Sequence, residues 1–365
     1  MKYRPIHLSY LVVLLLLASC QKEIKTKDGL PLMELEGIEL LNTPYAIVKV
    51  IPLETNQNNL LGDHLTLKFT ENALFIFDEN ARDVIHSFDR NGNYQGRTVE
   101  TGQGPGMVAR ITDFIPTAEG MEILSTLGDQ AEVIQFDNNG EIIGQVGLEY
   151  FATSIAKLPG GHYVASGSYN LPLVENRLAI INEEGETVME FLANKHEILP
   201  AQEKNFSTID EAVFFHEIYN TQTYQVTEDQ LVPQYQFDFG KYRIPERFFD
   251  MDWMAGFEML NQQGFATISQ YWESKQKAFF GIDVQVNGER KNHQVILDKG
   301  NMEAGKRITS TTDLTAFYHP VGVFDELLVF IAQAPDYLKL EADQLPDNSP
   351  MVQEGDNPVL LFVKF

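Results

Sequence analysis

The sequence predicts an all-β fold, a six-bladed β-propeller closed by pairing of its N-terminal and C-terminal strands. Three observations lead to this expectation. Short apolar runs alternate with Asn, Gly and Asp along most of the chain, a turn pattern repeats at nearly constant spacing, and each end of the chain carries a strand that lacks a hairpin partner nearby.

The repeated turns set the length of the structural unit. They occur at Phe88–Gly92, Phe136–Gly140 and Ile181–Gly185, and their glycines lie 48 and then 45 residues apart. Asn-Gly turns favour hairpins because both residues tolerate positive φ. A period near 45 residues suits a four-stranded propeller blade and is too long for most solenoid repeats.

The strands before these turns are apolar on both faces. Ala73–Phe77 and Met121–Leu124 are almost unbroken apolar runs, as expected for sheets that are covered on both sides. The same rhythm continued along the chain gives six blades. We expect them at about 64–99, 111–147, 153–192, 206–239, 264–298 and from 312 onward.

The last blade lacks one strand. Its expected strands are Thr312–Phe317, Leu327–Ala332 and Val359–Phe365, whereas Ala46–Leu53 forms a spare strand near the N-terminus. Pairing of the two terminal strands would close the ring and remove two exposed sheet edges.

The N-terminus is predicted to be a signal peptide. Lys2 and Arg4 precede an apolar run, Leu8–Ala18, which is far shorter than the roughly 20 residues that a membrane-spanning helix needs. The following Leu-Ala-Ser-Cys resembles a bacterial lipobox, so we expect Cys20 to carry lipid; two or more acyl chains hold a protein stably at a bilayer. The expected organisation is a signal peptide at 1–19, a lipidated Cys and tether at 20–45, and the propeller at 46–365.

Gln21 follows the cysteine, and the absence of Asp at this position resembles lipoproteins that are sorted to the outer membrane. The expected location is therefore the outer membrane, with the propeller on its periplasmic or cell-surface face. The membrane, reached through the lipid anchor, is the first expected partner.

Three further motifs resemble one family. Ile51–Thr55, Gly102–Gly106 and Asp356–Leu360 are similar, in this order and at blade-length spacing, to motifs of the six-bladed β-propeller lipoproteins, relatives of the NHL-repeat propellers. The resemblance implies the fold and an envelope location, and most members have no assigned activity. Met107 departs from the acidic residue expected after Gly-Pro-Gly, which argues against a cation site at this turn.

Composition excludes several classes of function. The formal net charge is −25, and a surface of this sign repels nucleic acid, so no nucleic-acid partner is expected. Cys20 is the only cysteine, which excludes an intramolecular disulfide or a cysteine cluster for a metal. The chain has no His-Glu-x-x-His, Gly-x-Ser-x-Gly or Walker sequence, and no cofactor or metal is predicted.

Two kinds of loop motif share features with known phosphate-binding and calcium-binding loops. Gly102–Gly106 could cradle a phosphate, but a strand rather than a helix is expected after it, which favours an inter-blade turn. Asp89-x-Asn91 and Asp137-x-Asn139 share alternating oxygen ligands with calcium loops, yet their glycines come too early for an EF-hand. The two Asp-x-Asn motifs are therefore interpreted as hairpin turns.

The candidate binding residues fall into two groups. His64, Arg110, Asp113 and His216 are expected near the mouth of the central channel. The segment 246–263 interrupts the β pattern with a helical stripe that includes Trp253 and Phe257, which could form an aromatic platform or simply pack on the blades.

Two functional classes follow from these groups. The favoured one is a scaffold that binds an envelope protein, a peptide or a glycan. The alternative is a hydrolase or lyase that uses acids and histidines at the channel mouth, and the sequence assigns no catalytic residue to it.

Overall fold

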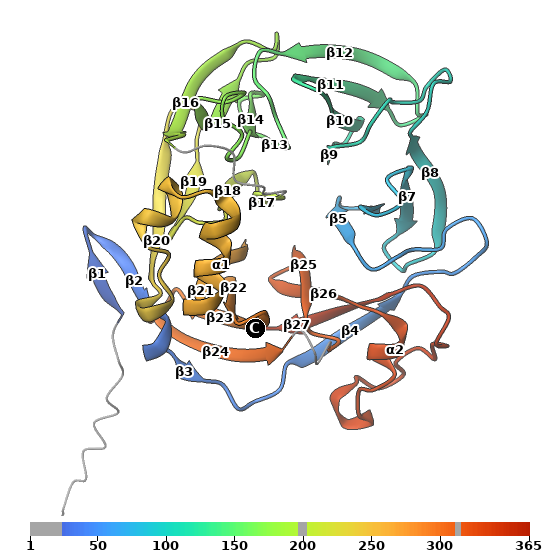
Figure 1. The fold of residues 1–365 in the computed structure, drawn as a ribbon. Coiled ribbons are helices and arrows are strands. Elements are labelled where there is room, and N and C mark those ends of the chain that lie inside the picture. The colour runs from blue at the N-terminus through green and yellow to red at the C-terminus, as the bar shows by residue number, and fades with distance from the viewer. Residues whose placement is uncertain (1–23, 196–202, 311–314) are drawn as a thin grey trace, which may run out of the picture.

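Six β-sheets stand in a ring in the computed structural model, which describes residues 24–195, 203–310 and 315–365 (Figure 1). Each sheet is built on four antiparallel strands, so the predicted six-bladed propeller is confirmed. The first three blades contain β5 (Leu65–Phe69), β6 (Ala73–Asp78), β7 (Val84–Asp89), β8 (Tyr94–Glu100); β9 (Asp113–Pro116), β10 (Gly120–Leu127), β11 (Gln130–Asp137), β12 (Ile142–Leu148); and β13 (Ser154–Lys157), β14 (Tyr163–Ser166), β15 (Asn176–Ile181), β16 (Thr187–Ala193).

The other three blades follow the same plan, with one difference in the sixth. They contain β17 (Phe206–Ile209), β18 (Ala212–Phe215), β19 (Gln222–Val226), β20 (Leu231–Asp238); β21 (Phe265–Glu273), β22 (Lys277–Val286), β23 (Glu289–Asp298), β24 (Glu303–Ser310); and β25 (His319–Phe324), β26 (Leu327–Ala332), β27 (Val359–Lys364) with β4 (Ala46–Pro52). The fifth blade extends to Ser310, beyond the expected end at 298, because β23 and β24 form a further hairpin.

The ring closes where the sequence predicted. β27 pairs with β4 in antiparallel register, with Leu361 opposite Val50 and Lys364 opposite Ala46. Gly92 in the first blade shows how tightly this seam packs. It has a φ of 86°, and a Cβ atom there would lie 2.1 Å from the carbonyl oxygen of Pro52.

The segment from Lys25 to Leu40 corrects the expectation of a tether through residue 45. It forms β1 (Lys25–Lys27), β2 (Leu30–Glu34), the 3-10 helix η1 (Leu35–Gly37) and β3 (Glu39–Leu40). β2 pairs in parallel with β20, and β3 pairs in parallel with β24. The segment therefore covers the outer edges of the fourth and fifth blades, which would otherwise be unpaired.

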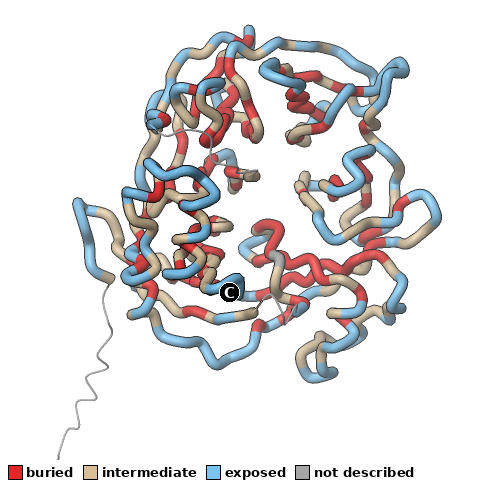
Figure 2. The backbone as a smooth tube through the Cα atoms, viewed as in Figure 1, coloured by how far each residue is buried: buried red, intermediate tan, exposed pale blue. Residues whose placement is uncertain are grey.

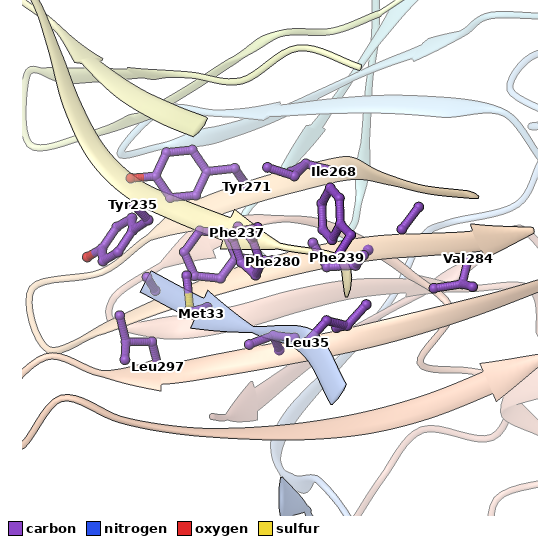
Figure 3. Packing of buried hydrophobic residues seen from close by; sticks show 14 of the residues in the cluster. Met33, Leu35, Tyr235, Phe237, Phe239, Ile268, Tyr271, Phe280, Val284 and Leu297 are labelled. Atoms are coloured by element: carbon purple, nitrogen blue, oxygen red, sulfur yellow. The ribbon is translucent and has the colours of Figure 1, made fainter. Parts of the chain in front are cut away.

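Apolar side chains fill the space between neighbouring blades. Buried residues concentrate within the sheets and exposed ones on the outer strands and loops (Figure 2). Figure 3 shows the cluster between the fourth and fifth blades. The ring centroids of Phe237 and Phe280 lie 4.9 Å apart, and Met33 of β2 packs beside these rings. Packing of this kind fixes the angle between adjacent blades.

One face of the ring carries the long connections. The innermost strands, β5, β9, β13, β17, β21 and β25, all begin at this face, and the connections 53–64, 101–112, 239–264 and 333–358 lie on it. The opposite face has short turns such as 70–72, 117–119 and 325–326. We call the first face the long-loop face.

Candidate functional site

The largest irregular elements of the long-loop face are two insertions. Residues 239–264 contain η2 (Gly240–Tyr242), η3 (Glu246–Asp250) and α1 (Trp253–Gln263), as the helical stripe predicted. Residues 333–358 contain α2 (Ala334–Tyr337) and η4 (Ala342–Gln344). Tyr337 is buried and its hydroxyl donates to the carbonyl of Pro350 at 3.0 Å, which anchors this second insertion.

Helix α1 is fixed at its start and on one side. The Asp252 carboxylate caps it by accepting from the backbone N–H groups of Met254 and Ala255 at 3.1 and 3.2 Å. Leu260 is fully buried in a cluster with Phe248 and Tyr169, and the helix packs against η3 and against β22 of the fifth blade. The helix is therefore a rigid support for whatever it exposes.

The two aromatic residues predicted on this segment have different environments. The Trp253 side chain is 52% exposed, next to Met254 at 65%. Phe257 is partly buried, and the centroid of its ring lies 5.3 Å from that of Phe248 and 6.3 Å from that of Tyr219. Trp253 is thus available to a ligand, whereas Phe257 belongs to the packing that holds the helix.

Asp113 lies in the wall of the central channel and joins three blades. Its Oδ1 pairs with the Lys68 ammonium at 2.8 Å, and its Oδ2 accepts from the Ser154 hydroxyl at 3.2 Å and the backbone N–H of Ile155 at 3.0 Å. Burial opposes ionisation, but the charges of Lys68 and Lys204 outweigh it and hold the pKa of this carboxyl below its usual range. Asp113 is therefore an ionised inter-blade bridge.

Lys204 spans the channel mouth. It comes just before the fourth blade, yet its ammonium donates to the carbonyl of Thr112 in front of the second blade and lies 3.4 Å from the Glu79 carboxylate beside the first. Glu79 also accepts from the Thr66 hydroxyl at 2.7 Å. These contacts tie opposite sides of the ring together across the channel.

Glu203 is the most perturbed acid at this mouth. Its carboxylate accepts from the Ser168 hydroxyl at 3.1 Å, the Asn205 amide at 3.0 Å and the backbone N–H of Ile218 at 2.6 Å. Burial, with a contribution from the charge of Glu217, nevertheless raises the pKa of Glu203 to about 7. Glu203 is thus a group whose charge changes near neutral pH.

The backbone around Glu203 is constrained. Ser168 and Tyr219, which flank it from the third and fourth blades, have φ values of 52° and 66°. Side chains other than glycine rarely adopt this left-handed conformation, and such residues often occur at functional sites. The sequence contains no spacing that indicates this group, because it is assembled from loops of separate blades.

The other predicted mouth residues lie in different environments. His216 is buried against Tyr271 with ring centroids 6.5 Å apart, and burial lowers its pKa to about 4, so the ring is neutral. His64 and Arg110 are exposed at the ends of their loops. Within the described ranges no group of three or more His, Cys, Asp or Glu residues is arranged to hold a metal ion.

The turn motifs behave as the sequence indicated. Asp89 Oδ1 accepts from the backbone N–H groups of Asn91 and Asn93 at 2.8 and 3.0 Å, so it caps its own hairpin. The Gly102–Gly106 stretch lies between two blades and is closed by a bond from the Gly102 N–H to the Val108 carbonyl. These are structural turns.

The geometry of the chain agrees with a family assignment. The sequence pattern described as "Domain of unknown function (DUF4934)" matches residues 41–364, which is nearly the whole propeller. The chain belongs to the DUF4934 family. The search of curated proteins found no match to the DUF4934 chain.

The chain is also similar to several solved structures. The DUF4934 chain is similar to a protein from Bacteroides fragilis that is assigned as exported, with a TM-score of 0.73, 16% identity, and coverage of 91% of this chain and 98% of that one. A protein of unknown function from Bacteroides caccae has a TM-score of 0.37, 10% identity, and coverage of 67% and 93%. The extracellular domain of a hybrid two-component system from B. thetaiotaomicron has a TM-score of 0.44, 11% identity, and coverage of 76% and 34%.

The likeness to the B. fragilis protein agrees with the propeller fold of the DUF4934 chain. The long-loop face offers an exposed aromatic residue on a fixed helix beside a charged channel mouth. In the described part of the chain no helix is long and apolar enough to span a bilayer.

Proposed function

We propose that the DUF4934 chain is a lipid-anchored binding module of the outer cell envelope, which captures a glycan, a peptide or a protein partner on its long-loop face beside α1. The observation that carries this proposal is the exposed ring of Trp253 on a helix whose other side is fixed in the core. A rigid aromatic side chain offers a large contact area at low entropic cost, and Trp is enriched among residues that dominate binding energy.

The channel mouth supports binding rather than catalysis. Lys204 spans it, and Asp113 is held in an ion pair with Lys68. His216 is neutral and packs against the buried ring of Tyr271. A ligand would therefore contact the loops of the face.

Trp253 provides a direct test because the chain contains only two tryptophans. A Trp272→Phe variant leaves Trp253 as the single indole, so its emission reports on the face alone. Titration with panels of oligosaccharides and peptides should shift this emission saturably for at least one ligand. Trp253→Ala should weaken capture of that ligand at least tenfold, whereas Ile143→Ala, at an exposed site on β12, should not. Equal affinity of the two variants would refute a site at α1.

The anchor at Cys20 lies outside the described residues and remains part of the proposal. The first described strand, β1, begins at Lys25, five residues after Cys20, and five residues of chain span at most about 17 Å. Such a short linker would hold the outer edges of the fourth and fifth blades close to the bilayer. Cys20→Ala should release soluble, folded protein from membranes, and a variant that still fractionates with membranes would contradict lipid attachment.

A further inference from the structure

A second cavity, apart from α1, lies at the outer wall between the fifth and sixth blades. Its volume is about 640 Å³, within the usual range for small-molecule sites. Its walls come from the crossing segment 40–45, from the end of β24, from the residues before β25 and from the 333–358 insertion. Three of these four walls lie outside the repeated strands of the blades.

Most of the large side chains that line this cavity are apolar. Leu41, Pro44, Phe317 and Leu340 contribute to it, and Ile308 is 43% exposed. These apolar side chains favour a ligand with an apolar portion, because burial of apolar surface away from water is favourable. The cavity also contains a cation that has no ion-pair partner among the described residues, and this cation determines the kind of ligand the cavity can accept.

That cation is Arg307. Its Nε and Nη2 donate to the carbonyl of Thr43 at 3.2 and 3.0 Å, and its Cζ lies 4.0 Å from the centre of the Tyr45 ring. Its Nη1 is buried and has no acceptor among the described residues, and the hydroxyl of Thr309 in the same cavity is likewise unpartnered there. A guanidinium has five N–H donors, so both hydrogens of Nη1 remain unused.

Arg307 also has no ion-pair partner in the part of the chain that the structure describes. Over residues 24–195, 203–310 and 315–365, no carboxylate lies within ion-pair distance of it, although acids outnumber bases by 52 to 27 in the chain. Lys339, which lines the same cavity, is paired with Asp336 at 2.7 Å. A buried donor without an acceptor and a charge without a counter-ion both lower the stability of a fold, and a bound anion would satisfy both.

We propose that this cavity binds a small monocarboxylate with an apolar body, with the carboxylate on Arg307 and Thr309 and the body against Leu41, Phe317 and Leu340. A carboxylate presents two oxygens and one negative charge, which match a guanidinium edge. A phosphate or sulfate would bring more charge and more oxygens than the two unmet groups satisfy. This site is independent of the binding proposed at α1.

The probe for this site is octanoate, with acetate and 1-octanol as comparisons. Calorimetry should show saturable binding of one octanoate per chain. Acetate and octanol should bind at least tenfold more weakly, because acetate lacks the long alkyl chain and octanol lacks the carboxylate. Arg307→Gln should weaken octanoate at least tenfold and leave octanol unchanged. Lys339→Gln is the matched control and should retain octanoate affinity, since its charge is already neutralised by Asp336.

A second measurement uses the unaltered protein, because Arg307 also supports Thr43 and Tyr45. Phenylglyoxal labelling of Arg307, read by mass spectrometry, should fall at least threefold in the presence of octanoate, whereas labelling of the exposed Arg243 should not. Absence of saturable octanoate binding would overturn the proposal. So would octanoate affinity that survives in a folded Arg307→Gln protein, or octanoate binding without protection of Arg307.

Discussion

Glu203 shows how a single residue acquires properties that its sequence neighbours do not indicate. Its raised pKa comes first from burial, which is produced by loops of the third and fourth blades, and then from the charge of Glu217. Glu217 is itself buried and held by Arg177 through two bonds of 2.8 and 2.9 Å. No local motif encodes such an arrangement, because the groups that create it are 14 to 35 residues away.

Glu203 should make the stability of the fold depend on pH. Because its pKa is raised in the folded state, the folded chain binds the proton more tightly than the unfolded chain. The free energy of unfolding should therefore fall between about pH 4.5 and pH 7 by up to about 3 kcal/mol from this group, and Glu203→Gln should remove that contribution. A Gln amide can donate to the Ser168 hydroxyl while its oxygen still accepts from Asn205 and Ile218.

The measurement is denaturant unfolding of both proteins at pH 5 and pH 8. Glu203→Gln should be the more stable protein at pH 8 and nearly equal to the unaltered chain at pH 5. Asp137→Asn, which alters an exposed turn acid with a lowered pKa, is the control and should show no gain at pH 8. A Glu203→Gln protein that follows the pH profile of the unaltered chain would show that the acid ionises freely in the fold.

At the scale of elements, the sequence predicted what local chemistry determines. The Asn-Gly turns, the apolar strands before them, the helical segment at 246–263 and the apolar run at each end of the chain all follow from residues that are close together in the sequence. The β2 strand was not predicted, because Leu30–Glu34 contains a proline and its only neighbour along the chain, β1, is a three-residue strand within the expected tether. Its strand pairing depends on β20, which lies about two hundred residues away and can be identified only in three dimensions.

This N-terminal segment should contribute measurably to stability. Met33 and Leu35 are each 1% exposed and pack into the cluster shared by the fourth and fifth blades, and the buried Lys306 ammonium donates to the Leu35 carbonyl. Met33→Ala should lower the free energy of unfolding by about 2–4 kcal/mol through lost burial and a residual cavity. Leu40→Ala, at a 59% exposed position of the same segment, should change it by less than about 0.5 kcal/mol. Similar values for both variants would mean that the segment does not bind the blades in solution.

At the scale of the whole molecule, the ring depends on one seam between residues that are three hundred positions apart. β4 supplies the outer strand of the sixth blade, and Ile51 and Leu53 pack with Leu360 and Phe362 where the sixth blade meets the first. Each of the other blades is continuous in sequence, so this seam is where the chain ends must meet before the propeller is complete. Its removal would expose the apolar edge of β27 and open one inter-blade interface.

A chain that begins at Leu60 should therefore fail to form a stable monomer, whereas a chain that begins at Asn42 should succeed. The second chain loses β1, β2 and β3 but keeps β4, so it remains a closed ring with a lower free energy of unfolding. Size-exclusion chromatography with light scattering should find oligomers or aggregates for the first chain and monomers for the second. Thermal unfolding should show a cooperative transition only for the second. A Leu60 chain that stays monomeric and unfolds at the midpoint of the Asn42 chain would show that the seam is dispensable, and would place the stability of the ring in the packing between the five sequence-continuous blades.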